Sequence, residues 1–244
     1  MIEYVAETGS TNADLITRSA SETLPEGYWL VADRQKSGRG RRGSAWEDGS
    51  GNFMGSTIVQ LQDTDPAPAS LSFVAALALR EAIGQCIDGR HVLQLKWPND
   101  LVLDRCKVSG ILLERAGNTI VVGIGVNIVS APKLPDRPTI ALHDAGAKVS
   151  RDEFATLLQD SFAQELKAWR FGHAQGFGIV GVLNNFMFSS VHQLGAMTTV
   201  HDLDGNVISG TFAGLEEEDG ALCLRQPDGS ERVLRAGEVI LGRS

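Results

Sequence analysis

The sequence predicts an α+β protein: a mixed β-sheet flanked by helices over residues 1–189, followed by a small antiparallel β-barrel over residues 190–244. Apolar residues recur at helical spacing between Pro68 and Gly89, which is typical of an amphipathic helix facing a core. The run 119–128 is rich in β-branched residues, which favours a buried strand. Asp-Gly pairs at 204–205, 219–220 and 228–229 separate short apolar runs, the pattern of a hairpin series.

The remaining elements follow from capping and turn signals. Thr11-x-x-Asp14 is a capping signature that predicts a helix to about residue 20, and Ser150-x-x-Glu153 is a capping box that opens a helix reaching Trp169. A shorter helix is predicted at 178–188. The predicted strands are 28–32, 53–61, 93–96, 101–103, 108–114 and 119–128, and in the barrel 198–200, 207–212, 221–224 and 232–234.

Composition and charge exclude several classes of protein. With 43% hydrophobic and 21% charged residues, the 244-residue chain has the composition of a folded soluble protein. The net charge of −8 disfavours a general polyanion binder, and residues 192–244 carry four basic against nine acidic residues. Three cysteines without a Cys-x-x-Cys pair predict neither a disulfide framework nor a zinc site. Without a signal-like start or an apolar run of about 20 residues, we expect a cytoplasmic protein with no membrane partner.

One loop is an exception to the acidic character of the chain. Arg34, Lys36, Arg39, Arg41 and Arg42 lie within ten positions that contain no acid, which indicates a local anion site. The segment 38–43 also matches Gly-x-Gly-x-x-Gly, but polar residues separate it from the preceding strand and a strand, not a helix, follows it. That context argues against a dinucleotide site. We interpret the loop as a mobile cover for an anionic ligand, the alternative being a solvated basic turn.

A second group of residues lies around a predicted hairpin. If 101–110 form that hairpin, Asp100 and Lys107 approach one another across the strands, and Gly110 leaves room beside the lysine. A lysine in a cleft can bridge a carboxylate and a phosphate, and a nearby aspartate could hold magnesium. A surface salt bridge is the equally weighted alternative. The chain has no His-x-x-x-His pair and no Gly-x-Ser-x-Gly, so a zinc hydrolase and a nucleophile elbow are not predicted.

Taken together, these segments resemble the biotin–protein ligase family. The resemblance rests on Ser10-Thr11-Asn12, on Gln35 with 38–43, on 96–100, on 107–112 and on 123–127, in that order, with a barrel of matching size behind them. It implies a class II synthetase-like catalytic domain with a C-terminal SH3-like barrel. Since only nine residues precede Ser10, it also implies a dedicated ligase without the N-terminal DNA-binding domain that some members carry, and hence no nucleic-acid partner.

The resemblance implies a two-step reaction with ATP, Mg²⁺ and biotin as substrates and no tightly bound prosthetic group. Biotin is activated to biotinyl-5′-AMP and then transferred to a lysine of a biotin carboxyl carrier domain, by a monomer or a homodimer. Lys107, Arg39 and Arg41 are the implied catalytic residues, with Asp100 as a magnesium residue. The implied biotin-binding residues are Ser10, Thr11, Asn12, Gln35, Gly38, Arg39, Gly40, Arg41, Lys107 and Gly110. The implied nucleotide-binding residues are Arg41, Arg42, Trp46, Lys96, Asn99 and Asn127.

Two other functions compete with this one. A lipoate–protein ligase shares the catalytic fold and the adenylate chemistry, but the string Gly-Arg-Gly-Arg-Arg-Gly characterises the biotin branch. A non-enzymatic nucleic-acid binder could use the basic loop and the barrel, but the acidic charge of the barrel has the wrong sign for it.

Overall fold

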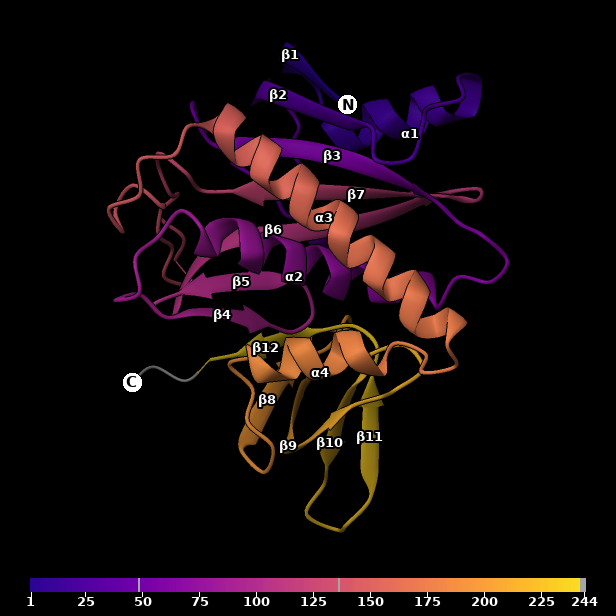
Figure 1. The fold of residues 1–244 in the computed structure, drawn as a ribbon. Coiled ribbons are helices and arrows are strands. Elements are labelled where there is room, and N and C mark those ends of the chain that lie inside the picture. The colour runs from indigo at the N-terminus through magenta and orange to yellow at the C-terminus, as the bar shows by residue number, and fades with distance from the viewer. Residues whose placement is uncertain (48, 136, 242–244) are drawn as a thin grey trace.

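The computed structural model describes residues 1–47, 49–135 and 137–241, without the side chain of Arg42. A large sheet of seven strands has the order β1-β2-β3-β7-β6-β5-β4, and a small sheet of five has the order β11-β10-β9-β8-β12. The small sheet lies at the β4 edge of the large one (Figure 1), where residues 189–191 of the linker bond to Leu95 of β4. The predicted α+β architecture is confirmed.

The large sheet is mixed because β1 and β2 are parallel and the other neighbouring strands are antiparallel. Its strands are β1 (Ile2–Thr8), β2 (Trp29–Gln35), β3 (Phe53–Gln60), β4 (Leu93–Lys96), β5 (Asp100–Leu103), β6 (Cys106–Ala116) and β7 (Thr119–Val126). The helices are α1 (Thr11–Ser21), α2 (Leu71–Gly84), α3 (Arg151–Ala174) and α4 (Val180–Phe188), with 3₁₀ turns at Arg41–Gly43 and Pro68–Ser70. No helix within the described ranges is both long enough and apolar enough to cross a bilayer.

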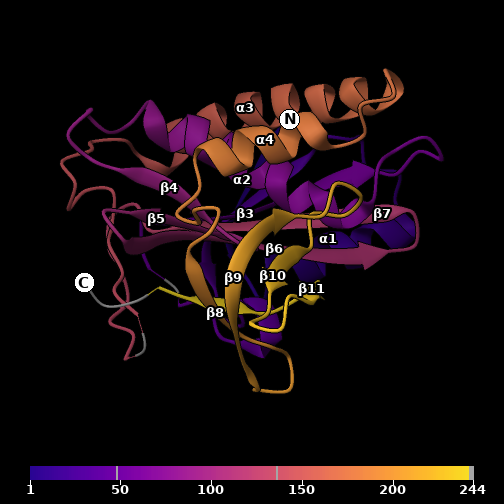
Figure 2. The ribbon, with the colours of Figure 1, turned by 90° about the horizontal axis from the view of Figure 1, so that it is seen from below.

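The helices divide between the two faces of this sheet. Trp29 and Val31 of β2 belong to the core cluster beneath α2 and α3, whereas Leu30 belongs to a separate cluster with Leu15 of α1. Successive side chains of a strand point to opposite faces, so α1 covers the face that α2 and α3 leave open. Figure 2 shows α2, α3 and α4 together on one side of the large sheet.

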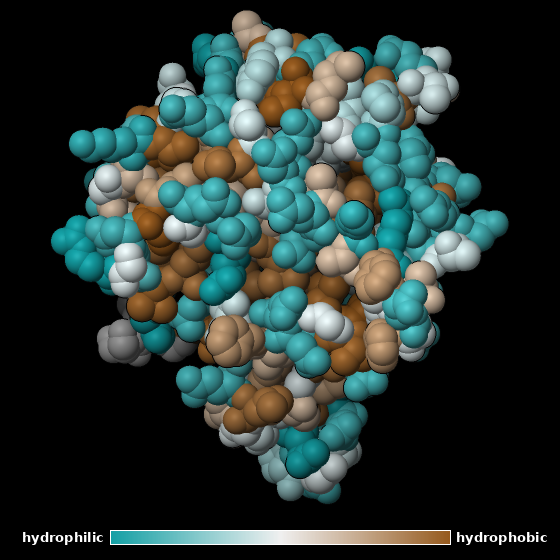
Figure 3. All heavy atoms as spheres, viewed as in Figure 1, coloured by the Kyte–Doolittle hydropathy of each residue, from teal (hydrophilic) through white to brown (hydrophobic). Residues whose placement is uncertain are grey.

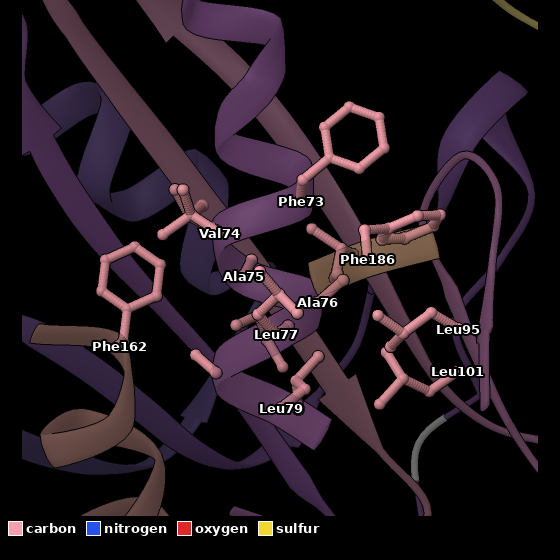
Figure 4. Close-up of a cluster of buried hydrophobic side chains, with 14 of the residues drawn as sticks. Phe73, Val74, Ala75, Ala76, Leu77, Leu79, Leu95, Leu101, Phe162 and Phe186 are labelled. Atoms are coloured by element: carbon pink, nitrogen blue, oxygen red, sulfur yellow. The ribbon is translucent and has the colours of Figure 1, made fainter. Parts of the chain in front are cut away.

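The helix α2 is more deeply buried than an amphipathic stripe implies. Besides the predicted inward residues, Phe73, Ala76 and Leu77 are buried, because α3 and α4 cover the sides of α2 that the sheet does not. The close-up in Figure 4 shows Phe73 and Phe186 next to each other on one side of this helix and Phe162 on the other. The predicted apolar stripe faces the core, as expected, and the buried surface of α2 extends beyond it. Hydrophilic side chains follow the outer surface of α3, with hydrophobic patches beside them (Figure 3).

The capping signals had different outcomes. At α3 the capping box is confirmed, because Ser150 Oγ accepts from Glu153 N–H and Glu153 Oε2 accepts from Ser150 N–H. At α1 the predicted cap was wrong: the N-cap is Ser10, without a side-chain cap bond, and Thr11 is the first helical residue. Asp14 instead accepts a hydrogen bond from Thr8 Oγ1, which ties α1 to the end of β1.

The small sheet is formed by β8 (Met197–His201), β9 (Val207–Leu215), β10 (Leu222–Arg225), β11 (Glu231–Leu234) and β12 (Glu238–Ile240). All three predicted Asp-Gly turns connect neighbouring strands, and their glycines have the positive φ angles that such turns require. The strand β12 was missed, and so was β1 at the other end of the chain. Division of the chain at residue 189 remains a prediction.

Candidate active site

Side chains that point away from α2 on the large sheet form the floor of a cavity on that face. Across β4, β5, β6 and β7 the strand register aligns Lys96, Asp100, Gly110 and Gly125 in one row. Leu95 and Leu101, which point the other way, belong to the core. The row places two charged side chains at the β4 edge and two glycines, which have no side chain to fill the space above them, further along the floor.

A cavity of about 330 Å³ lies on this floor, walled by the start of α1, the basic loop and β12. Most of the implied site residues line it: Ser10, Thr11, Asn12, Gln35, Arg39, Gly40, Arg41, Trp46, Lys96, Asn99, Asp100, Lys107, Gly110 and Asn127. Gly38 is not in its lining, and the Arg42 side chain lies outside the described structure. Segments more than 100 residues apart in sequence therefore meet around one space. The roles assigned to these residues remain predictions.

One end of the cavity holds uncharged polar groups. Gln35 Oε1 accepts hydrogen bonds from the backbone N–H of Thr11, at 2.8 Å, and from its hydroxyl, at 3.1 Å. Ser56 Oγ lies 2.7 Å from Thr11 Oγ1 and donates to Asn12 Oδ1 at 2.6 Å. We call Ser10, Thr11, Asn12, Gln35 and Ser56 the neutral cluster; all five are buried. The bonds among Thr11, Asn12, Gln35 and Ser56 hold these four side chains in set orientations before a ligand arrives.

Amino groups dominate the other end. Lys107 Nζ lies 2.7 Å from Asp100 Oδ1, which confirms the predicted approach across the β5–β6 hairpin. That hairpin turns at Asp104-Arg105, both with positive φ, as a two-residue turn requires. Lys96 is only 8% exposed, and burial lowers the pKa of its ammonium group, while the nearby carboxylates of Asp100 and Glu238 oppose this shift. A bound anion would stabilise the charged form of Lys96.

Among the basic side chains of the loop that the structure describes, which are those of Arg34, Lys36, Arg39 and Arg41, the last two line the cavity. Arg39 pairs with Glu114 of β6 at 3.5 Å, and Arg41 Nη1 donates to Asn99 Oδ1 at 3.2 Å and to Gly237 O at 3.3 Å. Lys36 instead points outward and pairs with Glu7 at 2.5 Å. After its single 3₁₀ turn the loop pairs Arg39 with Ala45 and continues to β3, so no helix follows it. The interpretation against a dinucleotide fingerprint is confirmed.

The indole of Trp46 lies over the floor between the two ends. A Cβ added at Gly125 would meet its Cε2 atom at 2.3 Å, and one added at Gly110 would meet its Cζ3 atom at 3.3 Å. Glycine at 125 is therefore required for the ring to take this place. Trp46 Nε1 is buried, and no hydrogen-bond acceptor for it is found among the described residues. An acceptor on a ligand could satisfy this donor.

Sequence reasoning missed several residues of the site. Ser56 supports Thr11 and Asn12 from β3, a strand that also contains the polar residues Thr57 and Gln60, so no local signal singled it out. Glu114 accepts a hydrogen bond from Asn12 Nδ2 at 2.8 Å. Glu238 of β12 lies 2.5 Å from Arg137 and 3.9 Å from Lys96, and no local pattern pointed to Arg137 or Glu238. Thus β12 completes the cavity wall.

Asn127 anchors the backbone near the cationic end, and the carboxylates of the site do not form a metal-binding group among the described residues. Asn127 Nδ2 donates to Ile140 O at 3.3 Å and to Lys107 O at 3.5 Å, so its amide fixes the chain on both sides of the cationic end. Within residues 1–47, 49–135 and 137–241 no group of three or more His, Cys, Asp or Glu side chains is arranged to hold a metal ion. Asp100 is thus a single carboxylate already paired with a lysine.

Comparison with known proteins agrees with this geometry. The model of the biotin/lipoate A/B protein ligase family matches residues 5–128, and that of the biotin protein ligase C terminal domain matches residues 194–242. A biotin–[acetyl-CoA-carboxylase] ligase of Paracoccus denitrificans is 36% identical, covering 98% of this chain and 99% of the relative. One from Mycobacterium tuberculosis is 31% identical, covering 98% and 88%.

Among solved structures, the biotin protein ligase from Aquifex aeolicus in complex with biotin and ATP is similar over 100% of this chain and 99% of that chain. Its TM-score is 0.81 and its sequence identity 26%. With two family models that cover both sheets and full-length relatives above 30% identity, the chain belongs to the biotin–protein ligases of the biotin/lipoate A/B protein ligase family.

Proposed function

We propose that this chain is an ATP-dependent biotin–protein ligase that forms biotinyl-5′-AMP and transfers biotin to a lysine of a biotin carboxyl carrier domain, such as that of acetyl-CoA carboxylase. The observation that carries the proposal is the polarity of the cavity. Ser10, Thr11, Asn12 and Gln35 of the neutral cluster line one part of it, and Lys96, Lys107 and Arg41, which we call the cationic end, contribute cations to the same space. Arg39 also lines it and is linked through Glu114 to Asn12.

The neutral cluster suits the ureido ring of biotin. This ring is uncharged and offers both N–H donors and a carbonyl acceptor, so its best partners are hydroxyl and amide groups rather than ions. Thr11 and Ser56 present hydroxyl groups beside the amides of Asn12 and Gln35. The bonds among these side chains pre-organise the cluster, which lowers the entropy cost of binding.

The cationic end suits the first step of the reaction. An oxygen of the biotin carboxylate attacks the α-phosphorus of ATP, the bond to the β-phosphate oxygen breaks, and pyrophosphate leaves. Both reactants are anions, so Lys107, Arg39 and Arg41 offset their repulsion and stabilise the negative charge that develops at phosphorus. Asp100, whose Oδ1 pairs with Lys107, would be the carboxylate that holds a magnesium ion arriving with the phosphates.

In the second step the amine of the carrier lysine attacks the acyl carbon of the mixed anhydride. The bond to the AMP phosphate oxygen breaks, AMP leaves, and the amine loses a proton as the amide forms. The loop from Arg39 to Trp46 covers the cavity, and by excluding water it protects the adenylate from hydrolysis. Trp46 Nε1 would donate to the bound adenylate.

The test compares two acyl substrates. The protein is incubated with MgATP, an unmodified carrier domain and either biotin or lipoate, and the mass of the carrier is measured. A carrier with its target lysine replaced by arginine is the control. We expect the mass of biotin to be added at that lysine alone. Transfer of lipoate without transfer of biotin would refute the proposal and favour the lipoate ligases, an alternative that relatives named as biotin ligases already disfavour.

A further inference from the structure

His192 lies in the linker between the two sheets and makes an unusual contact with the site. It is 6% exposed, and its Nε2 accepts a hydrogen bond of 2.9 Å from the backbone N–H of Trp97. Its ring packs against Phe212 of β9, with ring centroids 5.7 Å apart. Because a backbone N–H can only donate, Nε2 must be the unprotonated nitrogen of a neutral imidazole. Burial and the charge of Lys96 lower the pKa of His192 to about 4, in agreement with that state.

The N–H that His192 accepts lies beyond the hydrogen-bonding ladder of the sheet. The last residue pair between β4 and β5 is Lys96 with Asp100, so residues 97–99 form the connection between these strands. A buried N–H group without a hydrogen-bond acceptor is unfavourable. A strand connection whose N–H groups have no acceptor is also not held in one position. His192 supplies the acceptor from a position 95 residues further along the chain.

Trp97 is held from the small sheet as well. Its indole Nε1 donates to Gly220 O at 3.1 Å, in the turn between β9 and β10. The linker beside it is fixed to β4, because Leu95 N–H donates to Ser189 O at 2.8 Å and Val191 N–H donates to Leu95 O at 2.9 Å. The backbone and the side chain of Trp97 are therefore both anchored to the C-terminal part of the molecule.

The anchored connection carries much of the cationic end of the cavity. All residues from Lys96 to Asp100 line it. Asn99 accepts from Arg41 of the loop, and Asp100 pairs with Lys107. None of these contacts involves the neutral cluster, which is built on α1, β2 and β3. A shift of Trp97 would displace the groups for phosphate and leave those for the ureido ring in place.

We propose that His192 is a positioning residue for ATP, which acts through Trp97 to hold the segment 96–100 in its binding geometry. The inference rests on the proposed ligase activity, since it assigns ATP to the cationic end. It also gives the small sheet a defined role. Gly220 and Phe212 hold Trp97 and His192 from that side, so the C-terminal part of the chain sets the nucleotide end of the site.

The experiment compares His192→Leu with His192→Gln. Leucine removes the acceptor, whereas the Oε1 atom of glutamine can take the place of Nε2. In initial-rate assays of carrier biotinylation we expect His192→Leu to raise the KM for ATP about tenfold, with the Kd for biotin, measured by calorimetry without ATP, within about twofold of wild type. His192→Gln should restore the KM for ATP. His173→Leu is the matched control: it makes the same exchange at an exposed histidine of α3 that does not line the cavity, so it should leave the KM for ATP unchanged.

Three results separate the possible failures. If the wild-type protein does not transfer biotin, the proposed function fails. Suppose that the wild-type protein transfers biotin and that His192→Leu folds. If the KM for ATP of this variant is unchanged, or if its affinities for ATP and biotin fall equally, the positioning role is wrong and His192 is only structural. If His192→Leu does not fold, His192→Asn decides, because its shorter amide cannot reach Trp97 N–H. If the KM for ATP of His192→Asn equals that of His192→Gln, the proposal is overturned.

Discussion

A methyl group added at Gly125 tests the place of Trp46 in the site. In the Gly125→Ala variant the new Cβ would lie 2.3 Å from Cε2 and 2.4 Å from Cζ2 of the indole, where ordinary contact begins at 3.4 Å. The ring must therefore move by roughly 1 Å or more to escape the overlap. The backbone itself accepts alanine, because Gly125 is an interior residue of β7 without a positive φ.

The expected cost falls on ligand binding rather than on folding. Overpacking of a filled space typically costs about 1–3 kcal/mol, which corresponds to roughly a 5- to 150-fold change in an equilibrium constant. Trp46 belongs to neither hydrophobic core cluster and lies in a loop outside the helices and strands. We therefore expect Gly125→Ala to weaken binding of biotin and ATP within this range while the urea midpoint stays close to wild type.

Calorimetry with each ligand and urea unfolding followed by circular dichroism measure the two effects. Gly84→Ala is the control, because a Cβ at this last residue of α2 meets no atom within 4 Å. In the double variant with Trp46→Ala the clash is absent, so its loss of affinity should match that of Trp46→Ala alone. Wild-type affinity in Gly125→Ala, or full additivity of the two losses, would show that the wall formed by Trp46 over Gly125 is not needed.

Three further predictions concern the cationic end, stability and pH. Lys107→Gln should lower the rate of pyrophosphate release about 100-fold or more, because it removes the half-buried cation beside Asp100, and an unchanged single-turnover rate would contradict this. Arg170→Met should lower the free energy of unfolding by about 3–5 kcal/mol, because Arg170 pairs with Glu26 and with Asp65, whose side chain is only 3% exposed and would be left without its cation. Arg90→Met, at an exposed pair, should cost little in the same urea titration. His192 is neutral in the folded state with a pKa of about 4, against an ordinary 6.5, so its contribution to stability is complete above pH 6.5 and is lost as the pH falls toward 4. This loss amounts to about 2 kcal/mol between pH 7.5 and 5, and it should be absent in His192→Gln; identical pH profiles would refute it.

The sequence alone determined the features that depend on neighbouring residues. The Ser150–Glu153 box, the three Asp-Gly turns and the hairpin that brings Lys107 to Asp100 all follow from residues within about ten positions of one another. Capping, turn geometry and strand period act over such distances, so they can be read without a tertiary structure. The ordered motifs of the family added the site residues that no local rule supplies.

The tertiary structure decided which of these groups share a cavity. The pleat and register of four strands aligned Lys96, Asp100, Gly110 and Gly125, and packing of the small sheet brought Glu238 to Lys96 and His192 to Trp97. The edge strands β1 and β12 escaped prediction because their pairing partners are distant or their runs are short. Such contacts depend on how separate elements pack against each other, and no local pattern in the chain records that arrangement.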